Sequence, residues 1–264
     1  MIKRKINQLL GFLPLILCLT VWQILADQST RTKFLFGSPI LVIQKLAVNI
    51  ANGELLVHAA ITGIEALGGF LTGITVGSVI GFSLLYFPTL ASISRPYVLA
   101  LGAIPIFAFA PMMIVWFGVG IKMKIAMATF STILVALSQA YDGGRKVDPE
   151  LKILFELNNS SNRQLFQKLI LPSSIDWVLA SLRLNIGLAL LGAFIGEFIA
   201  SERGLGYIML KAGGLYDIPY VLAAGVCIIG LAFLFNFFVS VIEQNRRRFV
   251  ELISVPGMLR ATKH

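Results

Sequence analysis

The sequence has very little charge. Only 13% of its 264 residues are Asp, Glu, Lys or Arg, whereas a soluble globular domain carries about 25%. Hydrophobic residues make up 57% of the chain, and the mean hydropathy is +0.84. So few charges cannot cover a water-exposed surface, so we expect lipid to be the solvent. A membrane-spanning helix needs about 20 apolar residues, and the apolar content predicts an all-helical domain with roughly five to seven spans.

Several functional motifs are also missing. The sequence has no G-x-x-x-x-G-K-[ST] loop to hold nucleotide phosphates, no H-E-x-x-H, no G-x-S-x-G and no Cys/His cluster. We therefore expect no enzymatic activity, no cofactor and no metal. Cys18 and Cys227 lie in apolar runs, which favours packed or lipid-facing thiols. The net charge of +9 does not indicate nucleic-acid binding, because no basic patch is interleaved with aromatic residues.

The distribution of apolar residues predicts six spans and an orientation. The stretches are Gly11–Ala26, His58–Phe87, Pro96–Phe117, Ile121–Tyr141, Ile175–Ala200 and Pro219–Ile242. With the N-terminus in the cytoplasm, the inside segments hold twice as many basic residues as the outside ones, as the positive-inside rule expects. The inside residues are Lys3, Arg4, Lys5, Arg95, Arg145, Lys146, Lys152, Arg163, Lys168, Arg246, Arg247, Arg248, Arg260 and Lys263. The outside residues are Arg31, Lys33, Lys45, Lys122, Lys124, Arg203 and Lys211.

Both chain ends are therefore expected in the cytoplasm. The first stretch also has the basic start and apolar run of a signal peptide, but Trp22, Gln23 and Leu25 fit a small-residue cleavage site poorly. We divide the chain into an N-terminal span with an extracytoplasmic loop (1–57), a five-helix core (58–242) and a cytoplasmic tail (243–264).

Glycine and proline mark two of the spans. Gly69, Gly73, Gly77 and Gly81 recur every fourth residue, which places them on one stripe of the second span and predicts close helix packing. The third span contains three prolines, and kinked helices tend to border a cavity or pathway. These prolines are Pro96, Pro105 and Pro111.

The cytoplasmic stretch 142–174 is too polar to span and has clear helix signals. Asp148 and Pro149 are an N-cap and first-turn pair, and a short apolar helix follows them. Asn159 tolerates the left-handed backbone of a turn. Ser161 and Gln164 form a capping box for a second short helix, which Leu171-Pro172 is expected to end. The two helices have an apolar face that needs a partner to bury it.

This stretch resembles the "EAA" loop of binding-protein-dependent importer permeases. The resemblance is carried by Val147-Asp148-Pro149-Glu150-Leu151, Asn159, Gln164-Leu165-Phe166 and Leu171-Pro172, and it extends to Ala103-Ile104-Pro105, Trp116-Phe117-Gly118, Gly196-Glu197-Phe198 and Gly204-Leu205-Gly206-Tyr207. The chain is most similar to the nitrate/sulfonate/taurine-type branch, which also includes permeases for thiamine precursors. Two departures are Ile153-Leu154-Phe155 where the family usually has Glu-Ala-Ala, and Asn159 where it has Gly.

The resemblance implies a type I ABC importer permease (MetI-like) fold and a set of partners. These are an ABC ATPase subunit docked on the loop, an extracytoplasmic solute-binding protein, and a second copy of the chain across a shared pathway. The missing glutamate puts one contact with the ATPase in doubt but not the docking role. The loop residues assigned to ATPase coupling are Asp148, Pro149, Leu154, Phe155, Asn159, Gln164, Phe166, Leu171 and Pro172.

Three ionisable residues fall inside the predicted spans: Glu65, Arg183 and Glu197. A charge at bilayer depth costs about 2.5–3.5 kcal/mol, so such residues usually face a cavity, a partner or another helix. We treat them as candidates for the translocation pathway, with snorkelling the rival for Arg183 and a structural hydrogen bond the rival for Glu197. His58 is expected to be an interfacial residue rather than a ligand.

The main alternative is a stand-alone secondary carrier. Such a carrier would lack a docking loop and would usually contain an internal repeat with broken helices, and no repeat is evident. An exporter is disfavoured because the resemblance is to importers. The sequence does not identify the solute.

Overall fold

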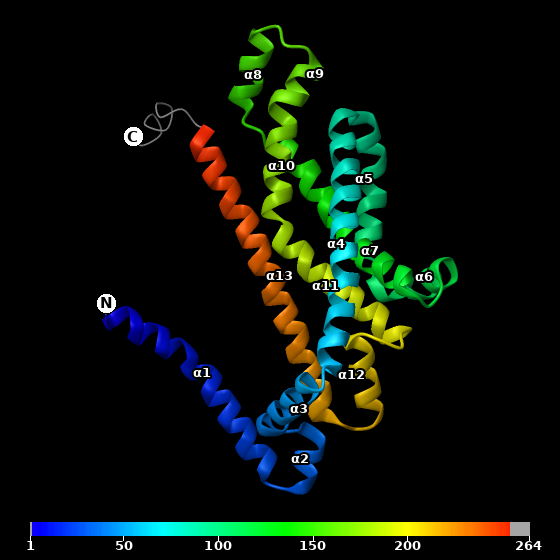
Figure 1. The fold of residues 1–264 in the computed structure, drawn as a ribbon. Helices are drawn as coiled ribbons and strands as arrows, with labels where there is room; N and C mark the ends of the chain where they lie inside the picture. Colours follow the sequence, from blue (N-terminus) through cyan, green and yellow to red (C-terminus); the bar gives the residue numbers. More distant parts are fainter. Residues whose placement is uncertain (1, 254–264) are drawn as a thin grey trace. The chain divides into compact units, whose positions relative to one another are not determined.

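The fold was analysed in a computed structural model of the chain, which describes residues 2–253 and the side chains of residues 13–244. These residues form helices and turns, with no strand among them. In chain order (Figure 1) the elements are α1 (Ile2–Asp27), α2 (Thr30–Phe36), α3 (Pro39–Ala51), α4 (Glu54–Tyr86), α5 (Pro88–Ala103), η1 (Ile106–Phe109), α6 (Ala110–Phe117), α7 (Ile121–Arg145), α8 (Pro149–Leu157), α9 (Asn162–Leu165), η2 (Phe166–Ile170), α10 (Leu171–Ala180), α11 (Leu182–Ile199), α12 (Leu205–Gly214) and α13 (Ile218–Ile253).

The chain divides into two compact units. The first comprises residues 1–62 and 197–229, and the second residues 63–196 and 230–264. Part of the predicted cytoplasmic tail, residues 254–264, lies outside the described residues.

The structure has up to six candidate spans, the number predicted, but one of them is the α2–α3 pair from the segment expected to be an extracytoplasmic loop. Four described helices are long and apolar enough to cross a membrane, namely α4, α7, α11 and α13, and the count rises to six if each of two bent helix pairs is one span. The apolar part of α1 with described side chains, Leu13–Asp27, is shorter. The chain is therefore an all-α, multi-pass membrane protein. Both cysteines are free thiols.

The predicted third span is not one straight helix. Helix α5 begins at Pro88, well before the expected start, and the α5–α6 pair is bent by 97°. Ile104 has extended backbone angles (φ −79°, ψ 126°) because it precedes Pro105, whose ring disfavours a helical residue before it. Pro111 then occupies the first turn of α6, where its missing N–H costs no hydrogen bond. The expected cytoplasmic segment 88–95 is thus the start of α5.

The predicted end of the second loop helix at Leu171-Pro172 is also wrong. The backbone stays helical from α9 through η2 into α10, and η2 is a π-helical turn. The wider turn lies directly before Pro172, where an α-helix would have to accommodate the proline ring and a missing N–H. Ser173 and Ser174, just after Pro172, lie inside α10, where their hydroxyls donate to the carbonyls of Leu169 and Ile170.

In the first unit, the segment expected to be an extracytoplasmic loop forms two helices. Ser29 and Thr32 make a reciprocal capping box at the start of α2. Gly37, with a φ of +64°, separates α2 from α3, and Ser38 caps α3. Further along the first unit, an ion pair joins Lys45 of α3 to Asp217, just before α13.

The core of the second unit is built from α4, α7, α11 and α13. One cluster buries Phe70, Ile186 and Val239 against one another, so helices far apart in the sequence meet there. Helix α10 packs along α7. The large apolar residues that remain exposed on α13 are those expected of a helix that faces lipid.

Candidate functional site: the coupling segment and the buried polar residues

The glycine stripe of α4 forms the contact with α7, as predicted. A Cβ atom added at Gly69, Gly73, Gly77 or Gly81 would clash with α7 in every case. The facing residues of α7 are small and fully buried, and they also recur every fourth position: Ala128, Thr132, Ala136 and Ala140. This stripe of small residues on α7 has the same spacing in the sequence as the glycine stripe of α4. Two small-residue stripes let the two backbones approach closely without a hydrophobic driving force.

The same helix pair contains a buried ion pair. The Lys124 ammonium lies 3.4 Å from the Glu65 carboxylate, and both side chains are less than a tenth exposed. Glu65 is therefore a helix-to-helix contact. Lys124, placed in an outside segment from the sequence, is instead inside α7. The sequence shows opposite charges in the second and fourth apolar runs. It does not show that these two helices are neighbours, so the ion pair could not be predicted.

The coupling segment (residues 148–170) begins with the predicted local structure. The Asp148 carboxylate accepts a hydrogen bond of 2.9 Å from the backbone N–H of Glu150 and caps α8. Asn159 has a φ of +52°, the left-handed turn expected of it. Ser161 and Gln164 then form the reciprocal capping box of α9. These features depend on residues at most three positions apart, which explains why the sequence predicts them.

The apolar residues of the coupling segment have two different environments. On α8, Leu154 and Leu157 are 52% and 75% exposed, while Phe155 is half-buried. On the following helix the ring of Phe166 packs edge-on against Tyr86 of α4, with centroids 5.2 Å apart, and Leu169 is buried. The second helix is thus anchored to the rest of its unit, and α8 presents the unpartnered apolar surface.

The junction between α7 and α10 fixes where the coupling segment leaves the helical core. Gly143 lies so close to Trp177 that an added Cβ would meet the indole side chain at 2.6 Å. The Lys146 ammonium lies over the same ring, 4.1 Å from its centroid. A cation at that distance from an indole face is favourable by about 0.5–2 kcal/mol. These contacts join the two helices, α7 and α10, that flank the coupling segment.

In the first unit, Glu197 holds the turn that precedes α12. Its carboxylate accepts hydrogen bonds of 2.7 Å from the Thr62 hydroxyl and from the backbone N–H of Gly206. Gly204 has a φ of +105°, and a Cβ there would clash with the carboxylate. The His58 Nδ1 accepts a hydrogen bond of 2.8 Å from the Gly204 N–H. Glu197 is fully buried, and no pattern in the sequence connects Thr62 or His58 with it.

Arg183 has partners on another helix of its unit. At the start of α11, its guanidinium donates to the Glu243 carboxylate at 2.7 Å and to the Ser240 hydroxyl at 3.3 Å, both on α13. The arginine side chain is 56% exposed. Among the three candidates, Glu65 and Arg183 belong to the second unit and Glu197 to the first.

Comparison with known proteins identifies the family. The profile of the binding-protein-dependent transport system inner membrane components matches residues 73–248, which include most of the α4–α7 contact, the coupling segment and Glu197. The chain belongs to this family. It is an ABC importer permease.

Relatives of the permease are similar over most of their length. A probable ABC transporter permease from Haemophilus influenzae is 29% identical over 86% of this chain and 92% of its own. A riboflavin transport system permease from Chloroflexus aurantiacus is 31% identical over 80% and 78%. A formylaminopyrimidine transport permease from Halalkalibacterium halodurans is 27% identical over 84% and 88%.

Two further relatives support the branch indicated by the sequence. A putative aliphatic sulfonates transport permease from Bacillus subtilis and a taurine transport permease from Escherichia coli are each 24% identical over 92% of the permease, covering 88% and 90% of their own chains. Among solved structures, an inward-facing methionine ABC transporter has a TM-score of 0.58 at 17% identity, covering 76% of this chain and 95% of its own. This likeness confirms the fold.

Proposed function

We propose that the permease forms, together with a second copy of itself, the pathway through which an ATP-driven importer moves a small solute. An extracytoplasmic binding protein delivers the solute, and a separate ABC ATPase supplies the energy. Family membership supports this arrangement. The solutes named for the relatives, riboflavin, formylaminopyrimidine, aliphatic sulfonates and taurine, suggest a small polar organic molecule.

The observation that carries the proposal is the exposed apolar surface of α8. Leu154 and Leu157 lie more than half exposed on a short helix that also carries Glu150 and Glu156. A nine-residue helix that carries both leucines and glutamates is too short and too charged to lie in the hydrocarbon core of a membrane. Its leucines therefore need a protein partner, and a groove on the ATPase subunit would bury them.

The rigid attachment of the coupling segment suggests how the ATPase would act on the spans. Phe166 of the segment packs against Tyr86 of α4, and Lys146 over Trp177 joins the helices on either side of the segment, α7 and α10. A displacement of α8 by the ATPase would therefore move the helices rather than only the loop. The work comes from ATP binding more tightly to one of two conformations, since a ligand shifts an equilibrium only by its differential affinity.

The orientation and the division of the chain belong to the same proposal. We place both termini and the coupling segment in the cytoplasm, with the helices before residue 58 serving as a separate N-terminal part. The permease core extends to residue 242, and a cytoplasmic tail follows it. A cysteine introduced at the exposed turn, Asn159→Cys, should resist an impermeant thiol reagent in intact cells. Its labelling from outside would reverse the orientation.

The buried polar residues have supporting roles in this mechanism. Glu197 would fix the conformation of the outer turn at residues 201–206, which the binding protein would contact. It would do so through the hydrogen bonds that it accepts from Thr62 and Gly206. Glu65 and Lys124 would hold α4 and α7 together as the pathway opens and closes.

The ATPase interaction provides the test. The double variant Leu154→Ala/Leu157→Ala should weaken binding of the ABC ATPase subunit by about thirtyfold or more, because truncation of interface anchors commonly costs about 2 kcal/mol. Copurification from detergent and ATPase-dependent uptake in proteoliposomes measure the effect. The matched control is Glu156→Ala, an exposed charge on the same helix, which should change little.

Two outcomes would contradict the proposal. If the double variant inserts normally, retains its ATPase and imports at the wild-type rate, then α8 is not the docking surface. If the purified permease drives uptake with no ATPase present, the protein is a secondary carrier.

A further inference from the structure

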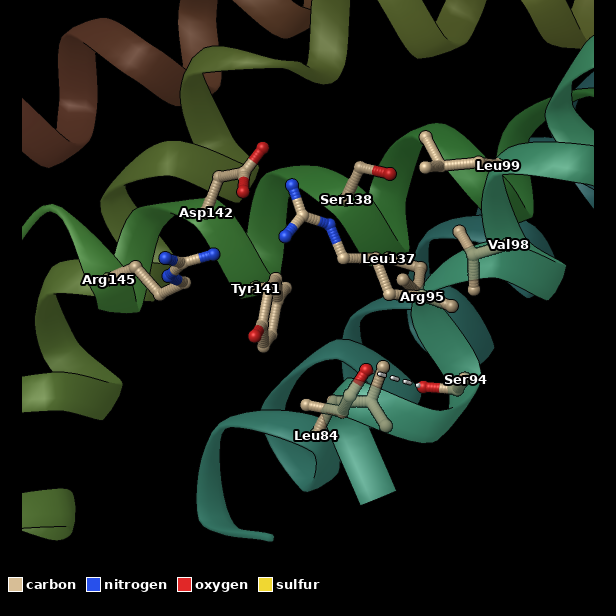
Figure 2. A pocket seen from close by; sticks show the side chains of 11 residues that line it. Leu84, Ser94, Arg95, Val98, Leu99, Leu137, Ser138, Tyr141, Asp142 and Arg145 are labelled. Carbon is tan, nitrogen blue, oxygen red and sulfur yellow. Dashed lines mark hydrogen bonds between the residues drawn. The ribbon is translucent and has the colours of Figure 1, made fainter. Parts of the chain in front are cut away.

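A cavity of about 200 Å³ lies in the second unit, and no residue of the coupling segment lines it. It lies where the end of α4, the middle of α5 and the last turns of α7 come together (Figure 2). Its charged lining residues are Arg95 of α5 with Asp142 and Arg145 of α7. In Figure 2 the Arg95 side chain extends from α5 toward α7.

The charge of the cavity is positive and uncompensated. Two guanidinium groups face one carboxylate, which leaves an excess of one positive charge. None of the three residues forms an ion pair within 4.0 Å with the described part of the chain. The Arg145 guanidinium instead lies 5.6 Å from the centroid of the Tyr141 ring. A negatively charged group bound between the arginines would complete the site.

The position of Arg95 within α5 favours an anionic partner. Arg95 is the eighth residue of α5, so it lies about 10 Å along the helix from its start. A charge held within a membrane-spanning helix is costly unless it is paired or reaches the interface. Basic pockets between transmembrane helices on the cytoplasmic side are sites at which anionic lipid headgroups bind.

Apolar residues line the end of the cavity that opens outward. Val98 and Leu99 continue the cavity along α5, one turn beyond Arg95, and Leu137 lines it from α7. Leu99 is 67% exposed, so this end of the cavity is not closed by the protein. A ligand that fits both ends has one negative charge at the arginines and a hydrocarbon portion along the leucines.

We propose that this cavity binds the phosphodiester headgroup of an anionic phospholipid, with an acyl chain lying against Leu99. The single negative charge of a phosphodiester matches the single excess positive charge of the lining. Arg145 and Arg95 donate to the phosphate oxygens, and Ser94 and Ser138 supply hydroxyl groups nearby. Inorganic phosphate offers the same oxygens but lacks the acyl chain, so the lipid should bind more tightly.

Lipid retention by the full-length permease tests the site. The purified protein is incubated with equal amounts of phosphatidylglycerol and phosphatidylcholine, and retained lipid is counted by native mass spectrometry. Arg95→Gln/Arg145→Gln should lower phosphatidylglycerol retention about thirtyfold, because each basic residue contributes roughly fivefold. Phosphatidylcholine retention should not change. Arg95→Lys/Arg145→Lys keeps the charge and should recover most of the loss, which separates binding from misfolding.

The matched control removes two charges from the same unit outside the cavity. Arg163→Gln/Lys168→Gln should retain phosphatidylglycerol like the wild type. The proposal is overturned if the cavity variant retains as much phosphatidylglycerol as this control, because the arginines would then only reach toward water. Displacement of the lipid by an equal concentration of inorganic phosphate would overturn the lipid assignment, since the site would then recognise the free anion.

Discussion

The α4–α7 contact and the coupling segment lie in the same unit of the permease but use apolar residues in opposite ways. In the α4–α7 contact, glycines meet alanines and a threonine, and every facing residue of α7 is fully buried. On α8 of the coupling segment, large leucines remain more than half exposed. The apolar residues of the first region are buried within the chain, whereas those of α8 are the ones that we propose the ATPase subunit buries. Substitutions in the first should therefore cost stability, and those in the second should cost binding.

The largest effect is expected at the buried ion pair of the α4–α7 contact. Lys124→Met keeps the size of the side chain but removes the ammonium beside Glu65, which should lower the free energy of unfolding by about 3–5 kcal/mol. Thermal unfolding in detergent measures it. The double variant Glu65→Leu/Lys124→Met should recover most of the loss, because no charge then remains buried. If both variants unfold like the wild type, the pair contributes nothing to the contact.

A smaller effect should follow from filling the glycine stripe. Gly73→Ala places a methyl group against Thr132 and should destabilise the protein by about 1–3 kcal/mol, as overpacking commonly does. Gly187→Ala is the matched control, because a Cβ at Gly187 of α11 meets no atom within 4 Å. Its helix should be slightly stabilised. Equal melting temperatures for the two variants would show that α4 and α7 are not closely packed.

The smallest effect should come from the turn of the coupling segment, and it should be confined to binding. Asn159→Gly suits the positive φ and should leave ATPase affinity within about twofold, whereas Asn159→Val should weaken it about fivefold, since a left-handed residue costs about 1 kcal/mol. The melting temperature of the permease should not change for either variant. A loss of thermal stability in Asn159→Val would mean that the turn supports the core instead.

The features predicted correctly from the sequence are those that depend on near neighbours or on composition. The cap at Asp148, the left-handed turn at Asn159 and the box of Ser161 with Gln164 are set by residues within one helical turn. The glycine stripe is a periodicity within one helix. The bend expected from the prolines of the third span is present at Pro105, whereas the helix end predicted at Pro172 is wrong. A proline breaks a helix or is accommodated by a wider turn according to what packs around it, and the chain does both.

The sequence by itself determined that lipid surrounds the chain, that the fold is all-helical, and which family the chain belongs to. It also determined the helix caps and the turn of the coupling segment. It could do so because charge content, periodicity and capping act over short distances. Only the tertiary structure decided that Lys124 pairs with Glu65, that Thr62 supports Glu197 from 135 positions away, and that Arg95 and Arg145 share a cavity. Each of these requires knowing which helices are neighbours. Such contacts arise from close packing between backbones distant in the sequence, so no local pattern of residues specifies them.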